Sequence, residues 1–220
     1  MFIDKLDDKI FSVWKPSAIT SNEIVYKIRE KYLLKVGHAG TLDPFAEGVL
    51  ILCTGKKTKE IKRVQSLSKK YTAEIELGSM TDTLDSEGQI ILKREVPKMS
   101  KSFLIKKLDE FKGEIMQAPP AFSALRRNNV RLYSLARKDI FLRLKPRKAY
   151  VESISLKKMQ KSSLVLEIVC KSGTYIRSLA RDIGESLGTC AYLKALRRDY
   201  IGEYCKNNSY SYEQILNESI

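Results

Sequence analysis

The stretch GHAGTLDPFAEGVL, residues 37–50, places Asp43 directly before Pro44, between glycine-bearing segments. It contains no lysine or arginine, although the whole chain carries a formal net charge of +14. An acid before proline commonly opens a turn and caps a neighbouring N–H group, which gives Asp43 a structural role. A second interpretation makes Asp43 a nucleophile or base on a loop whose glycines let a substrate approach closely. This stretch alone leaves both interpretations open.

The charge of the whole chain favours a polyanionic partner. Lys and Arg number 40 against 26 Asp and Glu, and the sequence pI is about 9.5. Without an amphipathic basic anchor, such an excess points to nucleic acid before membrane. Aromatic residues also stand beside basic ones, a mixture that suits phosphate contacts and base stacking on unstacked RNA. These groups are Lys69–Tyr71, Arg131–Tyr133, Arg147–Tyr150 and Tyr175–Arg177.

The chain has 220 residues, enough to bury a core, and no run of eighteen apolar residues. Its first residues do not read as a signal peptide, so the cytoplasm is the expected location. The cysteines are far apart, without a C-x-x-C pair, and a single histidine could not complete a usual zinc site with them. We therefore expect reduced thiols and no metal. The cysteines are Cys53, Cys170, Cys190 and Cys205.

Other stretches imitate known motifs and fail at a decisive position. TGKKTK, residues 54–59, lacks the first glycine at the Walker spacing. TDTLDSEG, residues 81–88, has its acids three apart, and Lys93 stands where a calcium loop needs Glu. No Ser-His-Asp set can be assembled with confidence around a single histidine. These failures exclude the commonest hydrolase and kinase readings.

Periodicity and turn residues predict an α+β protein. Helical spacing or capping predicts helices, and alternation or short apolar runs predict strands, while Pro119-Pro120 and Asn128-Asn129 predict a loop over 117–131. The irregular order of these elements argues for a mixed sheet with helices packed against it. The expected helices are 20–33, with Thr20 or Ser21 as N-cap, 100–113, capped by Ser100, 132–139 and 174–188. The expected strands are 9–16, 48–53, 69–78, 148–159 and 162–173.

Three other candidate residues have structural and functional readings side by side. His38 could be a structural histidine, and Tyr71 alternates with inward residues and could belong to the core. Arg177, near the start of a predicted helix, could be a surface arginine or the cation that keeps a desolvated carboxylate ionised.

The stretch 37–50 resembles the signature of TruB-type tRNA pseudouridine synthases, G-H-x-G-T-L-D-P-x-A-x-G-V-L, and matches every fixed position. Further matching stretches follow in order over nearly the whole chain, which makes the resemblance far more specific than a single motif. They are VWKPSAITSN, GKKTKE, KKYTAEIELG, TDTLDSEG, PPAFSALR, LYSLARKD, SGTYIRSLARDIGE and LRRDYIG. The resemblance implies the pseudouridine synthase fold, with a mixed, largely antiparallel central sheet flanked by helices.

The resemblance also implies roles for individual residues. Asp43 becomes the catalytic aspartate, Arg177 the partner that holds it ionised, and Tyr71 the aromatic residue that stacks on the target uracil. Leu196 would pack under the base, and His38 would lie against the refolded RNA loop.

The remaining residues of the predicted site serve binding. Lys15, with Pro16, would brace the catalytic loop, and Lys59 would meet phosphate. Tyr175 and Arg126 complete the expected substrate-binding set, the latter on a thumb loop that orders over the RNA.

The resemblance also gives an expected domain organisation. We expect a single catalytic domain over 1–220, with an inserted RNA-binding thumb loop at about 117–140 and a short helix at about 211–218. Many members continue into a β-rich RNA-binding domain, and here we expect no separate C-terminal β domain. The stretch 14–18, WKPSA, departs from the usual Asp-Lys-Pro-x-Gly.

The family reaction breaks the N1–C1′ bond of a uridine, rotates the base and rejoins it through C5. The expected substrate is the T-arm loop uridine at tRNA position 55, flipped out of its stack, with no metal or organic cofactor. Whether Asp43 attacks C1′, adds to C6 or removes a proton from C2′ stays open. We expect a monomer that needs no guide RNA. The alternative is an RNA-binding or RNA-folding protein that grips tRNA without chemistry, although binding alone needs no carboxylate facing an anion.

Overall fold

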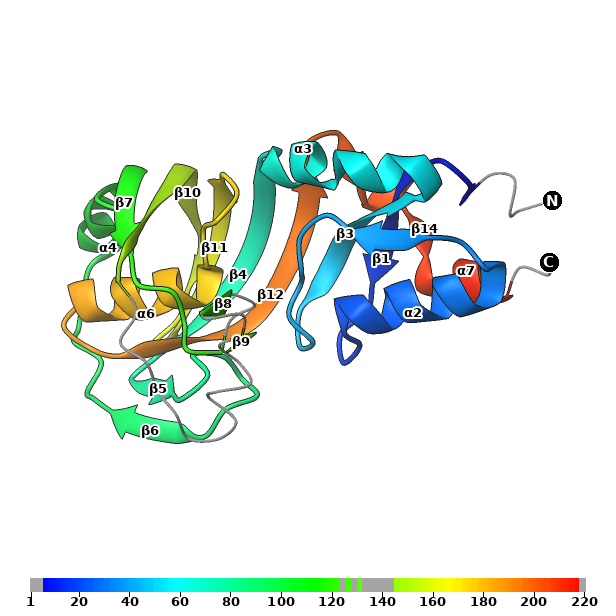
Figure 1. Cartoon of the computed structure of the whole chain (residues 1–220). Coiled ribbons are helices and arrows are strands. Elements are labelled where there is room, and N and C mark those ends of the chain that lie inside the picture. Colours follow the sequence, from blue (N-terminus) through cyan, green and yellow to red (C-terminus); the bar gives the residue numbers. More distant parts are fainter. Residues whose placement is uncertain (1–5, 123–125, 128–129, 132–144, 218–220) are drawn as a thin grey trace. The chain divides into compact units, whose positions relative to one another are not determined.

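The structure is a computed structural model that describes residues 6–122, 126–127, 130–131 and 145–217. The chain divides into two compact units (Figure 1). Unit 1 comprises residues 1–72 and 196–220, and unit 2 comprises residues 73–195. Strands β4 and β12 run from one unit into the other. The expectation of a single domain over 1–220 stays a prediction.

Unit 1 combines strands with helices from both ends of the chain. Its strands follow the order β14-β1-β3-β12, with β2 beside β3 and β13 beside β12. The β1–β3, β2–β3 and β12–β13 pairs are antiparallel, whereas β1–β14 and β3–β12 are parallel. The strands are β1 (Ile10–Lys15), β2 (Val36–His38), β3 (Glu47–Thr54), the start of β4 (Lys69–Leu77), the end of β12 (Ala191–Ile201), β13 (Tyr204–Cys205) and β14 (Tyr210–Ser211). The helices are α2 (Ser21–Tyr32), η1 (Gly55–Glu60), α3 (Ile61–Ser66), η2 (Lys206–Asn208) and α7 (Tyr212–Asn217).

Helix α2 forms where the sequence predicts it. The Thr20 side chain is the N-cap and accepts from the Glu23 N–H at 3.0 Å. Its apolar face, with Ile24 and Ile28 at helical spacing, is buried in a cluster that includes residues of β1 and β3. This packing fixes the segment that leads from β1 into the loop carrying Asp43.

Unit 2 is built around strands β4, β11, β10 and β7, which are neighbours in that order. The β10–β11 and β10–β7 pairs are antiparallel, and α4 and α6 lie against this sheet (Figure 1). The strands are the remainder of β4 and of β12, β5 (Ser79–Thr81), β6 (Ile90–Lys93), β7 (Gly113–Gln117), β8 (Arg126–Arg127), β9 (Val130–Arg131), β10 (Arg147–Met159) and β11 (Ser163–Cys170). The helices are α4 (Lys101–Asp109) and α6 (Ile176–Ser186).

The observed elements confirm the predicted α+β class and the mixed sheet flanked by helices. Strand β4 alternates buried and half-buried residues, as its sequence predicts. Ser100 caps α4, accepting from the Phe103 N–H at 3.1 Å, but the helix ends at Asp109 because the chain turns into β7 at Gly113. Helix α7 lies within the predicted range 211–218.

Some predicted features differ or cannot be compared. The short strands β8 and β9 interrupt the predicted loop over 117–131 and pair on either side of residues 128–129, where the asparagines favour a turn. The predicted helix over 132–139 lies outside the described residues, as does much of the thumb loop. The four cysteines are free thiols. Within the described ranges, no helix has both the length and the apolar character needed to cross a membrane.

Candidate active site

Asp43 lies in the loop that joins β2 to β3 and is half-buried. The Ala46 N–H donates to the Asp43 carbonyl at 3.2 Å, and the Ala18 N–H donates to the Pro44 carbonyl at 2.9 Å. The loop therefore contains the turn that an acid before proline predicts. The turn and a functional role for the carboxylate are compatible, because main-chain hydrogen bonds form the turn.

Lys15 holds this loop through hydrogen bonds from its side chain. Its side chain is fully buried, and Nζ donates to the carbonyl oxygens of Pro16, Pro44 and Ala46 at 2.8, 3.2 and 2.6 Å. A buried ammonium group is tolerated only when its donors are satisfied, and here each bond ends on a main-chain oxygen of the loop or of β1's end. This geometry supports the brace rather than a direct contact between Lys15 and a nucleotide.

Tyr71 and Leu196 occupy neighbouring strands of unit 1. Tyr71 lies on β4 and is 7% exposed, and Leu196 lies on β12 and is 6% exposed. The Thr72 hydroxyl donates to an Asp199 carboxylate oxygen at 2.7 Å, which places these parts of β4 and β12 side by side. Because Arg197 on β12 pairs with Glu47 on β3, Leu196 lies near the end of β3 where the Asp43 loop enters.

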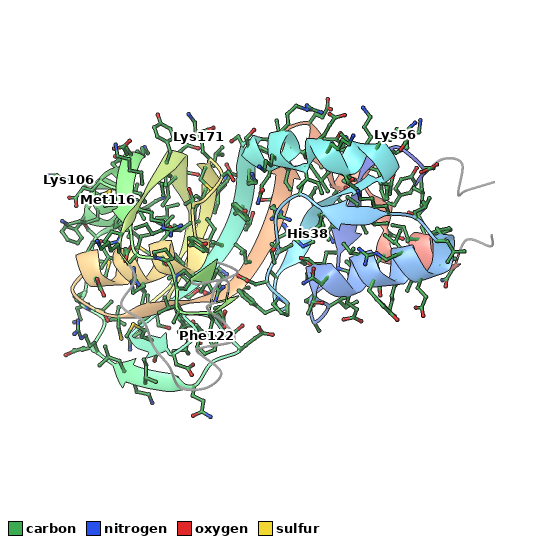
Figure 2. All side chains as sticks on the ribbon, viewed as in Figure 1. His38, Lys56, Lys106, Met116, Phe122 and Lys171 are labelled. Atoms are coloured by element: carbon green, nitrogen blue, oxygen red, sulfur yellow. The ribbon has the colours of Figure 1, made fainter. Side chains whose placement is uncertain are left out.

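The two other predicted residues of unit 1 lie on separate elements. His38 ends β2, half-buried, and pairs with Leu52 of β3 (Figure 2). Lys59 is an exposed residue of η1, and two nearby cations, Lys57 of η1 and Arg63 of α3, both pair with Glu60. These pairs lower the Glu60 pKa, chiefly through its hydrogen bonds to Lys57 and Arg63.

Arg177 belongs to the first turn of α6 in unit 2 and is buried, with its side chain 8% exposed. Its Nη1 lies 3.2 Å from an Asp85 carboxylate oxygen and donates to the Thr83 carbonyl at 3.1 Å. Its Nη2 donates to the carbonyl of Phe122 at 2.8 Å. The Asp85 side chain, 4% exposed, also accepts from the Thr83 hydroxyl and the Glu87 N–H. Arg177 is therefore buried, and the interpretation of Arg177 as a surface arginine is wrong.

Tyr175 is the N-cap of α6 and is held through its main chain. The Tyr175 N–H donates to Gln117 Oε1 at 2.8 Å, and Gln117 Nε2 donates to the Tyr175 carbonyl at 3.1 Å. The Ser178 hydroxyl adds a bond to the Ala118 carbonyl at 2.8 Å. The segment that begins the predicted thumb loop is thus fixed along the start of α6.

Arg126 falls in β8, where its main chain pairs with Arg131. Its side chain lies outside what the structure describes, so the expected phosphate contact stays a prediction.

The geometry reveals residues that sequence reasoning missed. Asp85 received no role of its own from the sequence, although it is a buried acid paired with Arg177. Gln117 and Arg198 are buried polar residues with satisfied donors. A signal existed for Arg198, because it shares a strand face with Leu196, but that signal needs β12, which the sequence did not predict.

The described arrangement offers groups for acid–base or nucleophilic chemistry. Unit 1 presents one half-buried carboxylate on a braced loop, and it carries an aromatic and an aliphatic residue on the adjacent strands β4 and β12. Unit 2 presents a buried arginine at a helix start. No group of three possible metal ligands occurs among the residues that the structure describes.

Comparison with known proteins gives one consistent family. The family model described as "TruB family pseudouridylate synthase (N terminal domain)" matches residues 26–176. A protein of Dehalococcoides mccartyi named "tRNA pseudouridine synthase B" is 44% identical over 209 residues, which cover 94% of this chain and 70% of that protein. A protein of the same name from Clostridium tetani is 39% identical over 212 residues, covering 96% of this chain and 73% of its relative.

A solved structure agrees with the sequence relatives. A chain in the crystal structure of a Cbf5-Nop10-Gar1 complex superposes with a TM-score of 0.75 and 26% identity. The match covers 98% of this chain and 56% of that one, so this chain spans little more than half of its structural neighbour.

Proposed function

We infer the function of this chain from one premise: it belongs to the TruB family of pseudouridylate synthases. On that premise the chain is an isomerase that converts the T-loop uridine at tRNA position 55 to pseudouridine. The relatives named tRNA pseudouridine synthase B supply the reaction and the RNA. The residues that perform it are our proposal.

The observation that carries the proposal is the loop around Asp43. The acid of the family signature is a half-buried residue in the structure. It lies in a turn whose carbonyl oxygens accept hydrogen bonds from the buried Lys15. A catalytic carboxylate must be held in a fixed orientation, and a loop braced in this way provides that orientation before substrate arrives. Asp43 is therefore the proposed catalytic residue.

The other proposed roles follow the fold. Tyr71 stacks on the flipped uracil and Leu196 packs under it. The two residues lie on adjacent strands, and Leu196 lies near the start of β3, where the Asp43 loop ends. His38 and Lys59 contact the RNA loop and its phosphates. Lys15 acts through the loop, because its ammonium is fully buried.

Unit 2 supplies the remaining proposed residues. Arg177 is the predicted cationic partner of Asp43, and its burial and hydrogen bonds support a role that needs one fixed orientation. Tyr175 and Arg126 are proposed to contact the substrate.

The reaction needs no external oxidant or reductant. The N1–C1′ bond breaks, the uracil rotates, and a C5–C1′ bond forms. The proton on C5 leaves to solvent and N1 gains one, so atoms and charge balance. Flipping the base out of its stack costs a few kcal/mol, which stacking and phosphate contacts offset.

The recognition surface follows from charge. With a formal net charge of +14, the chain suits a polyanion, and we propose that it grips the T-arm directly, as a monomer and without a guide RNA. Because the named relatives are bacterial enzymes of tRNA, we place the activity in the cytoplasm.

Tritium release tests this proposal. A tRNA transcript labelled with tritium at C5 of uracil is incubated with the protein, and a matched transcript with cytidine at position 55 serves as control. We expect one equivalent of tritium from the first transcript and none above background from the second. Binding without release would indicate the RNA-binding alternative, and equal release from both transcripts would move the reaction to another uridine.

A further inference from the structure

Arg198 is the largest fully buried side chain in the described part of the chain, at 1% exposure. Its guanidinium donates to three main-chain carbonyls, two at the start of the Asp43 loop and one in β3, which follows the loop. Nε donates to Val49 at 2.7 Å, Nη1 to Thr41 at 3.3 Å and Nη2 to Gly40 at 3.1 Å.

Arg198 and Lys15 reach the same loop from different strands. Lys15, on β1, binds the carbonyls of Pro44 and Ala46, which follow Asp43. Arg198, on β12, binds the carbonyls of Gly40 and Thr41, which precede it. Asp43 is thus flanked on both sides by peptide groups that a buried cation holds.

Leu42, which lies between the carbonyls bound by Arg198 and those bound by Lys15, is fixed as well. The Ser21 hydroxyl donates to the Leu42 carbonyl and accepts from the Leu42 N–H, both at 2.9 Å. The Ala46 N–H donates to the Asp43 carbonyl. With this bond included, each carbonyl oxygen from Gly40 to Pro44 accepts a hydrogen bond. The backbone on which Asp43 stands has little freedom left, and the carboxylate can vary chiefly through its own side-chain torsions.

The guanidinium suits this task better than another cation would. Its planar fork can bind three oxygens in different directions, and charge-assisted bonds are roughly twice as strong as neutral ones. The close approach of β3 and β12 also matters: a Cβ at Gly48, whose φ is +121°, would lie 2.3 Å from the Arg198 carbonyl oxygen. The main chains meet there without a side chain between them, so Arg198 can cross to the loop.

We propose that Arg198 is a positioning residue for catalysis, which sets the orientation of Asp43 by binding the Gly40 and Thr41 carbonyls. The proposal rests on the proposed function, since it assigns a task to the loop of the catalytic aspartate. A residue that only joined β12 to β3 would contribute to stability, whereas a positioning residue contributes to the rate of the chemical step.

The test separates those two contributions with single-turnover tritium release and tRNA affinity measured on the same proteins. Arg198→Met should lower the rate about a hundredfold, the scale of a misplacement of about 1 Å, while the dissociation constant for tRNA stays within about threefold. Arg198→Lys keeps the charge but not the fork, and its rate should fall about tenfold. Hydrogen exchange in the peptide covering 37–50 should become faster in both variants.

Arg197 is the matched control. It is the preceding residue, on the opposite face of β12, and its side chain is 47% exposed and paired with Asp199. Arg197→Met removes the same charge and should leave the rate within about threefold.

Gly40→Ala supplies a second test that spares the core. A Cβ at Gly40 would have no atom within 4 Å, but its φ of +107° strains any other residue, so the carbonyl that Arg198 binds should turn. This variant should lose rate and keep affinity, and it carries the test with Arg198→Lys if Arg198→Met does not fold. A wild-type rate for Arg198→Lys and Gly40→Ala, or equal losses in the Arg197 and Arg198 variants, would overturn the proposal. A wild-type protein that releases no tritium would instead refute the proposed function.

Discussion

The two regions that carry the proposed active site are held by different forces. In unit 1, the Asp43 loop is held by two buried cations, Lys15 and Arg198, whose described hydrogen bonds end on carbonyl oxygens. In unit 2, Arg177 is held by a buried carboxylate, Asp85, together with two carbonyls. The loop thus depends on hydrogen bonds to neutral acceptors, whereas the arginine depends on an ion pair.

This difference predicts how each region responds to loss of a negative charge. The hydrogen bonds that Lys15 and Arg198 donate to the loop end on main-chain oxygens, which Asp43→Asn leaves in place, so the loop should keep its shape. Removing the charge of Asp85 leaves Arg177 with a buried charge and one partner fewer, which is costly. Replacing Asp43 by its amide should therefore preserve the structure of its loop in unit 1, whereas replacing Asp85 by its amide should disturb the position of Arg177 in unit 2.

The largest effect among the unit 2 variants is expected for Arg177→Ala, which removes the predicted partner of Asp43 together with its anchors. Turnover should fall at least a thousandfold, and Arg177→Lys should recover only part, because an ammonium cannot reproduce the guanidinium fork. Single-turnover tritium release measures both. Near-normal turnover of the alanine variant would remove Arg177 from the site.

Asp85→Asn should come next. The amide keeps the size of the side chain but leaves Arg177 without its carboxylate, and we expect a loss of about a hundredfold in rate and about 3 kcal/mol in the free energy of unfolding. Asp82→Asn is the control, because Asp82 lies in the same loop and its Oδ1 accepts only main-chain N–H groups in the bonds described. If urea unfolding and turnover are alike for the two variants, the ion pair does not hold Arg177.

Gln117→Ala tests the neutral part of unit 2. Two hydrogen bonds to the Tyr175 main chain would be lost from a residue that is 2% exposed, at a cost of about 1–3 kcal/mol in unfolding free energy. The rate should fall about tenfold, since α6 keeps its other contacts. Gln89→Ala, at an exposed position of the same unit, should change neither quantity. An unchanged rate for the Gln117 variant would show that this clamp is purely structural.

The smallest effect concerns Asp182 of α6, whose pKa is raised mainly by burial, against the opposing pull of Arg181. Because the folded state favours the protonated acid, the contribution of this group to stability is full below its unfolded pKa and is lost as pH rises through the folded pKa. Asp182→Asn should therefore stabilise the protein at pH 7, by on the order of 1 kcal/mol or less, and this gain should vanish below about pH 4. Thermal unfolding at both pH values measures it, and a gain that persists in acid would contradict the assignment.

Sequence reasoning anticipated those parts of the fold that local signals determine. The N-cap at Thr20, the alternation of β4 and the turn at Asp43-Pro44 each depend on a few adjacent residues, and the structure has all three. Strand β12 was missed because its polar and charged residues follow no simple alternation. Arg198 was missed for the same reason, because its proposed role depends on the pairing of β12 with β3, which is far away in the chain.

The candidate site shows the same division. Asp43 stands out because its motif is contiguous, and the burial of Arg177 agrees with its expected role. Asp85 and Gln117 act through contacts with residues 92 and 58 positions away, and no local pattern marks such pairs. The single-domain organisation, the side chain of Arg126 and the pairing of Asp43 with Arg177 stay predictions.

The central claim is that one carboxylate, on a loop that keeps its shape without that charge, performs the chemistry on tRNA. Single-turnover tritium release by Asp43→Asn, with tRNA affinity and hydrogen exchange of the 37–50 peptide measured on the same protein, tests it most directly. We predict release below a hundredth of the wild-type rate, tRNA affinity within about threefold, and unchanged exchange in the loop. Release above a hundredth of the wild-type rate would contradict the assignment of Asp43, and faster exchange would contradict the account of how its loop is held.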